Sequence, residues 1–345
     1  MAQGINFALA ASVGAAAARP GPEITREEGL HLVSDLRNQA RRAVGYVAEI
    51  TGLCAAARRA AAGEIFVTDR RGFARGFVAM AQGLAAEAWA DDEIGWFSGQ
   101  AVGAQLGGVA GVLAQRMLGI YDPFYQARGE GAPGRVLLVA PNILRFEREL
   151  DSDPRDFHLW IALHELAHVV QFAAAPWLAG WVRDRFKELV DADPDEGRVG
   201  RLADAARRLP DLFTDTPPPD SVAAGLLAPS QAAVFAQITG AMSFLEGHAD
   251  VIMDAVGPRV VKSIEQLRPR FDARRLARGR LERAARRLAG LEAKTAQYVQ
   301  GASFVRAVLA ASGHEGLNRA FTGPEALPSA AEMEDPPAWV ARVLG

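Results

Sequence analysis

Cysteine is nearly absent from this chain of 345 residues, which contains only Cys54. A single cysteine excludes an internal disulfide and a zinc site built from several thiolates. Any metal ion must therefore be held by histidine and carboxylate side chains. So little cysteine also fits a reducing compartment, and we expect a cytoplasmic protein.

The sequence also lacks a large excess of charge of either sign. Its net charge is −3, with 23% charged and 50% hydrophobic residues, an ordinary balance for a globular protein. So small a net charge argues against general binding of polyanions, and we expect no nucleic-acid partner. Residues 1–18 are rich in alanine but carry no basic stretch, so we predict no signal peptide.

Long apolar runs are missing too, and residues 96–114 are the segment that comes closest to one. This uncharged run contains Gln100 and Gln105 and is poor material for a membrane span. Its glycines allow a close approach of another helix, so we expect a buried core helix and no membrane partner. They are Gly99, Gly103, Gly107, Gly108 and Gly111.

Most of the chain has the pattern of α-helix. Residues 25–50 open with Thr25 and Glu28, the spacing of a capping box. Apolar residues then recur at helical intervals and predict one buried face. They are Leu30, Val33, Leu36, Ala40, Val44 and Val47.

Two short segments, 64–68 and 135–140, have the composition of strands. The predicted fold class is therefore mainly α with a small β-sheet (α+β). We divide the chain into a mainly helical part, 1–130, and a catalytic part, 131–345, within one integrated domain. The second strand precedes the helix described next, so its edge is a candidate site for an extended peptide. Residues 210–230 are rich in proline and aspartate and predict a mobile insertion or a lid.

Residues 262–294 form a basic tract of eleven Lys or Arg against four Asp or Glu. An anionic partner is conceivable. However, the tract also carries an amphipathic stripe and few aromatic residues. We interpret it as the solvated face of a helix, paired with acidic surface elsewhere.

The most informative motif is His164-Glu165-Leu166-Ala167-His168, in a strongly apolar stretch that predicts a helix. Residues four apart lie on one face of a helix, so both imidazoles can bind one metal ion. Glu165 can then reach a water molecule without binding the metal, as the general base of a zinc hydrolase does. His164 and His168 are therefore candidate zinc ligands, and Glu165 is the candidate catalytic base.

Catalytic zinc usually has three protein ligands, so a third is needed. Glu246 is the preferred candidate, because Asp250 follows one helical turn later and could fix the ring of a ligating histidine. A glutamate followed by this aspartate also resembles the arrangement in gluzincin peptidases. His248 lies on a different side of such a helix and is expected to support the site or face the substrate.

Glu246 has three rivals as the third ligand, of which Glu188 and His248 stay open. Glu188 has the sequence spacing of compact gluzincins, but no carboxylate follows it by one turn. His248 is a second alternative. His158 precedes the motif by six residues and falls on the wrong face of the helix.

Zinc hydrolases benefit from a donor aimed at the oxyanion of the reaction. Tyr298, in a Tyr-x-x-Gly-Ala stretch, is similar to the tyrosine that has this role in aminopeptidase-N-like gluzincins. The alternative is a tyrosine buried in the core. His314 is a weaker candidate for the same role.

The chain resembles the zincin-like metallopeptidase family called zincin-2, of actinobacterial type. The resemblance extends over nearly the whole chain. It rests on the motif 164–168 and on residues 67–70, 121–123, 139–142, 246–254, 297–305 and 336–340. It implies a zincin-like fold and a zinc hydrolase but no particular substrate.

Two residues depart from the family pattern, Phe73 where tryptophan is expected and Ile120 where glutamine is expected. Both affect packing rather than the metal ligands. Some members of the family carry a label of deazaflavin-coenzyme biosynthesis. No glycine loop in this sequence suits a phosphate, so we expect no coenzyme site.

The leading hypothesis is a zinc-dependent metallopeptidase with a peptide as substrate. One alternative is a zinc hydrolase of a small, non-peptide amide, because the chemistry at zinc is the same. Another is a zinc-stabilised scaffold without catalysis, although a scaffold has no need of Glu165.

Overall fold

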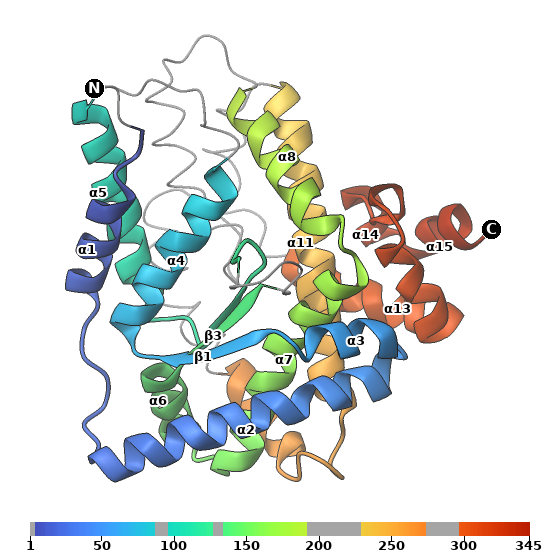
Figure 1. Ribbon diagram of the computed structural model, residues 1–345. Coiled ribbons are helices and arrows are strands. Elements are labelled where there is room, and N and C mark those ends of the chain that lie inside the picture. The colour runs from blue at the N-terminus through green and yellow to red at the C-terminus, as the bar shows by residue number, and fades with distance from the viewer. Residues whose placement is uncertain (1–3, 87–95, 127–133, 192–228, 274–296) are drawn as a thin grey trace.

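The computed structural model describes residues 4–86, 96–126, 134–191, 229–273 and 297–345. Helices form most of it and surround one small sheet (Figure 1). From the N-terminus to the last strand, the elements are α1 (Phe7–Ala17), α2 (Arg26–Thr51), α3 (Cys54–Ala60), β1 (Glu64–Thr68), α4 (Arg70–Ala85), α5 (Trp96–Leu113), β2 (Gly119–Asp122) and β3 (Arg135–Val139). It continues with α6 (Ala140–Leu150), α7 (Pro154–Ala174), α8 (Leu178–Asp191), α11 (Pro229–Ala255) and α13 (Gln297–Leu317), and ends with the short helices η2 (Asn318–Phe321), η3 (Pro324–Ala326), α14 (Ala330–Glu334) and α15 (Pro336–Leu344).

These elements confirm the predicted fold class, mainly α with a small sheet. The C-terminal helices α13, α14 and α15 gather on the side of the molecule opposite α1 and α5 (Figure 1). The strands β1 and β2 precede residue 130, where the predicted N-terminal part ends, and β3 follows it. All three strands belong to one sheet. Most of the insertion at 210–230 lies outside the described residues.

The sheet has the order β1-β3-β2, with β1 parallel and β2 antiparallel to β3. The central strand β3 is the buried run Val136-Leu137-Leu138-Val139, as expected for a strand covered on both faces. The prediction that this strand offers a free edge to a peptide is therefore wrong. In the described sheet the edge strands are β1 and β2, and the four residues of β2 are too few for a clear sequence pattern.

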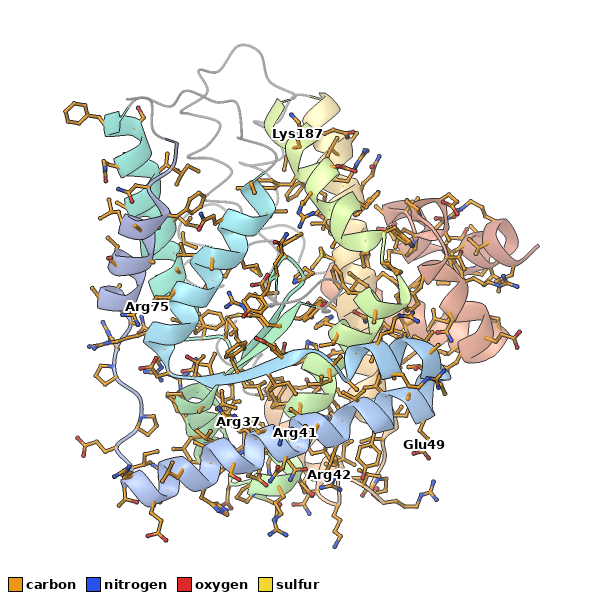
Figure 2. All side chains as sticks on the ribbon, in the orientation of Figure 1. Arg37, Arg41, Arg42, Glu49, Arg75 and Lys187 are labelled. Carbon is orange, nitrogen blue, oxygen red and sulfur yellow. The ribbon has the colours of Figure 1, made fainter. Side chains whose placement is uncertain are left out.

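Helix α2 begins at the predicted capping box. The Thr25 side chain accepts from the Glu28 backbone N–H, and the Glu28 carboxylate accepts from the Thr25 backbone N–H. Arg37, Arg41 and Glu49 point to solvent from this helix (Figure 2).

Two residues of the predicted buried face of α2 are not buried. Leu30 is 63% exposed and Val33 is half-buried, whereas Leu32 lies in the core. The buried side chains include Leu32, Leu36, Ala40, Val44 and Val47. Their spacing of three or four residues follows one helical stripe, and Leu30 lies off it.

Helix α5 packs against α1 through its glycines, as predicted. A β-carbon on Gly103 would lie 2.5 Å from Asn6 O, and one on Gly107 would lie 2.5 Å from Ala10 O. The expectation that α5 is fully buried is wrong, because Phe97 is 81% and Val112 50% exposed. Among the described residues, no helix is long and apolar enough to cross a membrane.

Helix α7 runs through the middle of the molecule and is buried along almost its whole length. It begins at Asp153, whose carboxylate accepts from the backbone N–H groups of Arg155 and Asp156. Pro154 occupies the first helical position, where no N–H partner is needed. Local sequence thus determines where the helix starts, and its apolar surface determines that it lies in the core.

Candidate metal centre

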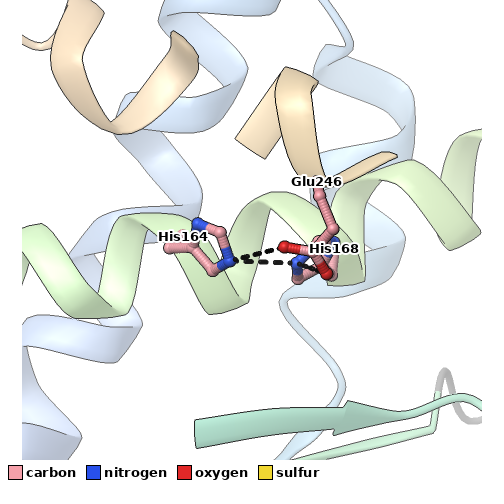
Figure 3. A group of neighbouring side chains, drawn as sticks. All are labelled: His164, His168 and Glu246. Carbon is pink, nitrogen blue, oxygen red and sulfur yellow. Dashed lines mark hydrogen bonds and ion pairs between the residues drawn. The ribbon is translucent and has the colours of Figure 1, made fainter. Parts of the chain in front are cut away.

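The two histidines of α7 meet a glutamate of α11. His164 Nε2 lies 3.2 Å from Glu246 Oε2, and His168 Nε2 lies 3.5 Å from Glu246 Oε1. The two Nε2 atoms are 3.3 Å apart. Figure 3 shows the three side chains converging on one point between the helices. Among the described residues, they form the only group of three or more His, Cys, Asp or Glu residues spaced to hold a metal ion.

These distances fit a zinc ion. Two ligands bound tetrahedrally at about 2.0–2.1 Å are separated by roughly 3.3–3.4 Å, which is close to the separation of the two Nε2 atoms and of each Nε2 atom from its nearer Glu246 oxygen. Two imidazoles and one carboxylate are also a known donor set for catalytic zinc, with the fourth position left to water or substrate. The side chains need little rearrangement to hold such an ion.

The electrostatics of this group also favour a cation. Burial lowers the pKa of His164, but the hydrogen bond and charge of Glu246, with the charges of Glu165 and Asp250, outweigh burial and raise it to about 10. Several carboxylates thus surround a half-buried imidazole. A positive charge, whether a proton or a metal ion, is stabilised there.

Glu165 lies beside the first ligand and is only 6% exposed. Its carboxylate approaches the first residue of β2: a β-carbon on Gly119 would lie 2.7 Å from Glu165 Oε1. Gly119 was missed in the sequence, because the contact joins two elements that no local pattern connects. The strand β2 therefore passes directly next to the candidate base.

Asp250 lies on the same helix as Glu246, one turn later. Its Oδ1 is 3.9 Å from His164 Nδ1, which is an ion-pair distance rather than a hydrogen bond. Its Oδ2 pairs with Arg268 at 3.1 Å. Asp250 thus lies between the ring of His164 and a guanidinium group.

Arg268 comes from the basic tract and also pairs with Asp254 and Asp272. This agrees with the interpretation that the tract pairs with acidic residues, but Arg268 is only 22% exposed and is not simply solvated. Residues 274–294 of the tract lie outside the described residues.

His168 is held on its other side by Gln171. His168 Nδ1 lies 2.9 Å from Gln171 Oε1, and Gln171 Nε2 lies 2.9 Å from His248 Nδ1. His248 is 1% exposed. Burial, followed by the charges of His314 and His168, lowers its pKa to about 3, so the ring is neutral. His248 therefore contacts the candidate ligand His168 only through Gln171. Gln171 was not singled out in the sequence.

The rival ligand Glu188 lies elsewhere. It is exposed on α8 and pairs with Arg185 at 2.6 Å. Its carboxylate is not part of the candidate metal group.

His158 also lies apart from the ligands, as its helical position predicts. Its Nδ1 is 2.7 Å from Asp35 Oδ2 and its Nε2 is 2.8 Å from Glu147 Oε2. Burial lowers the pKa of His158, but these hydrogen bonds outweigh burial and raise it overall. His158 thus joins α2, α6 and α7.

The two oxyanion candidates both belong to α13. Tyr298 is the second residue of this helix, but its side chain lies outside the described ones, so its role stays a prediction. His314 follows a kink at Gly313, where φ is 63°. Its Nδ1 atom is buried and has no hydrogen-bond partner among the described residues.

The comparisons with known proteins agree with a hydrolytic metal centre. The model of the zincin-like metallopeptidase family matches residues 5–340, so the chain belongs to this family. A crystal structure described as a candidate hydrolase with a novel fold, from Chloroflexus aurantiacus, has a TM-score of 0.65 and 28% sequence identity. The match covers 98% of each chain. No curated protein matches.

Proposed function

We propose that the protein is a zinc-dependent hydrolase that cleaves peptide bonds. The observation that carries this proposal is the meeting of His164, His168 and Glu246 at distances suited to zinc, with Glu165 beside them. The hydrolase class is also supported by the family and by the structural neighbour.

The residues divide into two roles. His164, His168 and Glu246 would hold the zinc ion, which supplies a Lewis acid that polarises a carbonyl and makes water more acidic. Glu165 accepts a proton from the attacking water and then returns it to the leaving nitrogen.

A peptide substrate is supported by the position of β2. In the described sheet this strand is at an edge, and its first residue lies against Glu165. An extended peptide that pairs with a strand edge presents its backbone carbonyls at regular intervals. A scissile bond could thus be brought to the candidate base by main-chain pairing.

The test combines metal content with a variant of the base. We expect about one zinc ion per chain, by elemental mass spectrometry, in protein purified without added metal. Glu165→Gln should keep this zinc and lose hydrolysis of a peptide library by about 10²–10⁴-fold. A wild type that binds no zinc, even after zinc is added, would contradict the proposal, as would full activity of the variant. Cleavage of small amides but not of peptides would agree with a zinc hydrolase but would contradict the proposal that its substrate is a peptide.

A further inference from the structure

Gln171 is completely buried on α7, one turn after His168. Its amide oxygen lies 2.9 Å from His168 Nδ1. Its amide nitrogen lies 2.8 Å from Leu245 O and 2.9 Å from His248 Nδ1. One acceptor and two N–H donors thus have three partners, so the side chain connects a metal-ligand helix with α11, which carries Glu246.

The orientation of this amide follows from one contact. Leu245 O is a backbone carbonyl and can only accept, so it must face the NH₂ group of Gln171. The amide oxygen then faces His168 Nδ1, which must carry the proton. The lone pair of His168 is therefore on Nε2, the atom that lies against Glu246 and His164.

His248 receives the second N–H of Gln171. Its Nδ1 must accept, which places the ring proton on Nε2. Phe244 and Phe321 flank the ring, with centroids at 6.0 and 5.4 Å. Nε2 has no hydrogen-bond partner among the described residues, so the contact with Gln171 is what selects the tautomer of His248.

We propose that Gln171 is a positioning residue of the metal centre: anchored by Leu245 O and His248 Nδ1, it holds His168 in the tautomer that presents Nε2 to the ion. This rests on the proposed zinc site. The opposite tautomer would set a lone pair of His168 against the amide oxygen. Turning the amide over would then place that oxygen against Leu245 O, leaving buried groups unpaired.

A purely structural role for Gln171 makes a different prediction, and Gln39 supplies the control. Gln39 is also a buried glutamine (4% exposed) with two side-chain partners, Asp35 and Arg42. It lies on α2, away from the ligands. Substituting methionine removes the hydrogen bonds at either position and nearly conserves the side-chain length.

The experiment measures zinc affinity by competition with a chelator, using the full-length protein. Gln171→Met should weaken zinc binding by about 10–100-fold, as is typical when a group that orients a ligand is lost. Gln39→Met should leave zinc affinity unchanged, even if both variants lose stability. The visible spectrum of the cobalt-loaded protein should change in Gln171→Met and stay the same in Gln39→Met.

Two variants of His248 test the anchor while leaving Gln171 in place. His248→Asn keeps an acceptor at the Nδ1 position and should retain most of the zinc affinity. His248→Leu removes the acceptor and should weaken zinc binding, and it carries the test if Gln171→Met does not fold. Equal zinc affinity of wild type, Gln171→Met and His248→Leu would overturn this inference and leave the zinc site standing. Failure of the wild type to bind zinc would overturn both.

Discussion

The main-chain atoms of Gly119 approach Glu165 so closely that a β-carbon on the glycine would lie 2.7 Å from both Cδ and Oε1 of the carboxylate. Real β-carbons do not come this near to other atoms. The candidate base therefore occupies the space that a side chain at the start of β2 would fill. Because residue 119 is glycine, the Glu165 carboxylate can lie directly against the main chain of β2.

Gly119→Ala should reduce hydrolysis by about 100-fold, because a displacement of about 1 Å is enough to misalign a catalytic group. The atoms that it meets belong to the end of a flexible side chain, so the fold and the zinc content should persist. Activity, zinc content and thermal unfolding of the variant check this. Gly45→Ala is the control, because its β-carbon meets no atom within 4 Å. Wild-type activity of Gly119→Ala would contradict the placement of Glu165.

The third ligand is tested by comparing two glutamates. Glu246→Ala should weaken zinc binding by more than the roughly 100-fold typical of groups that only orient a ligand. Glu188→Ala should bind zinc like the wild type, because Glu188 is exposed and paired with Arg185. Chelator competition measures both variants. The opposite result would make Glu188 the ligand.

Stability should depend on the protonation of His158. Its pKa is raised above the unfolded value of about 6.5, so its contribution to stability is complete below that pH. The contribution is lost as pH rises through the folded pKa, where Asp35 and Glu147 lose the positive charge between them. Urea unfolding at several pH values from about 6 to about 9 measures this loss.

His158→Gln should remove this pH dependence and lower the free energy of unfolding by about 3 kcal/mol at the acid end of the range. Substitution of the exposed His31 by glutamine is the control and should change little. An equal pH dependence in wild type and His158→Gln would show that His158 is not the titrating group.

The crossing of α11 and α13 depends on glycine. A β-carbon on Gly301 would lie 2.1 Å from Ser243 O, a main-chain atom that cannot turn aside. Gly301→Ala should therefore separate the helices and lower the free energy of unfolding by about 1–3 kcal/mol. Gly180→Ala, on α8, meets no atom within 4 Å and is the matched control. Chemical denaturation measures both, and equal stabilities would contradict a close crossing.

Sequence reasoning predicted the features that depend on neighbours within a few turns. The capping box of α2 and the two strands predicted at 64–68 and 135–140 are confirmed, the second ending one residue earlier, at Val139. The spacing of His164 and His168 placed their side chains together for the same reason, since a helix brings residues four apart onto one face. Leu30 was placed wrongly for a local reason: it lies about 120° around the helix from Leu36, whereas Leu32 lies about 40° from it.

Residues distant in sequence met only through the tertiary structure. Whether Glu188 or Glu246 joins the two histidines depends on which helix packs across α7, and no local pattern carries that information. The same holds for Gly119 beside Glu165. The sequence by itself determined a helix that carries His164 and His168 on one face, with Glu165 next to the first of them. The packing of α11 and β2 against that helix decided what surrounds them, because contacts between distant segments are fixed by the burial of the whole core rather than by local spacing.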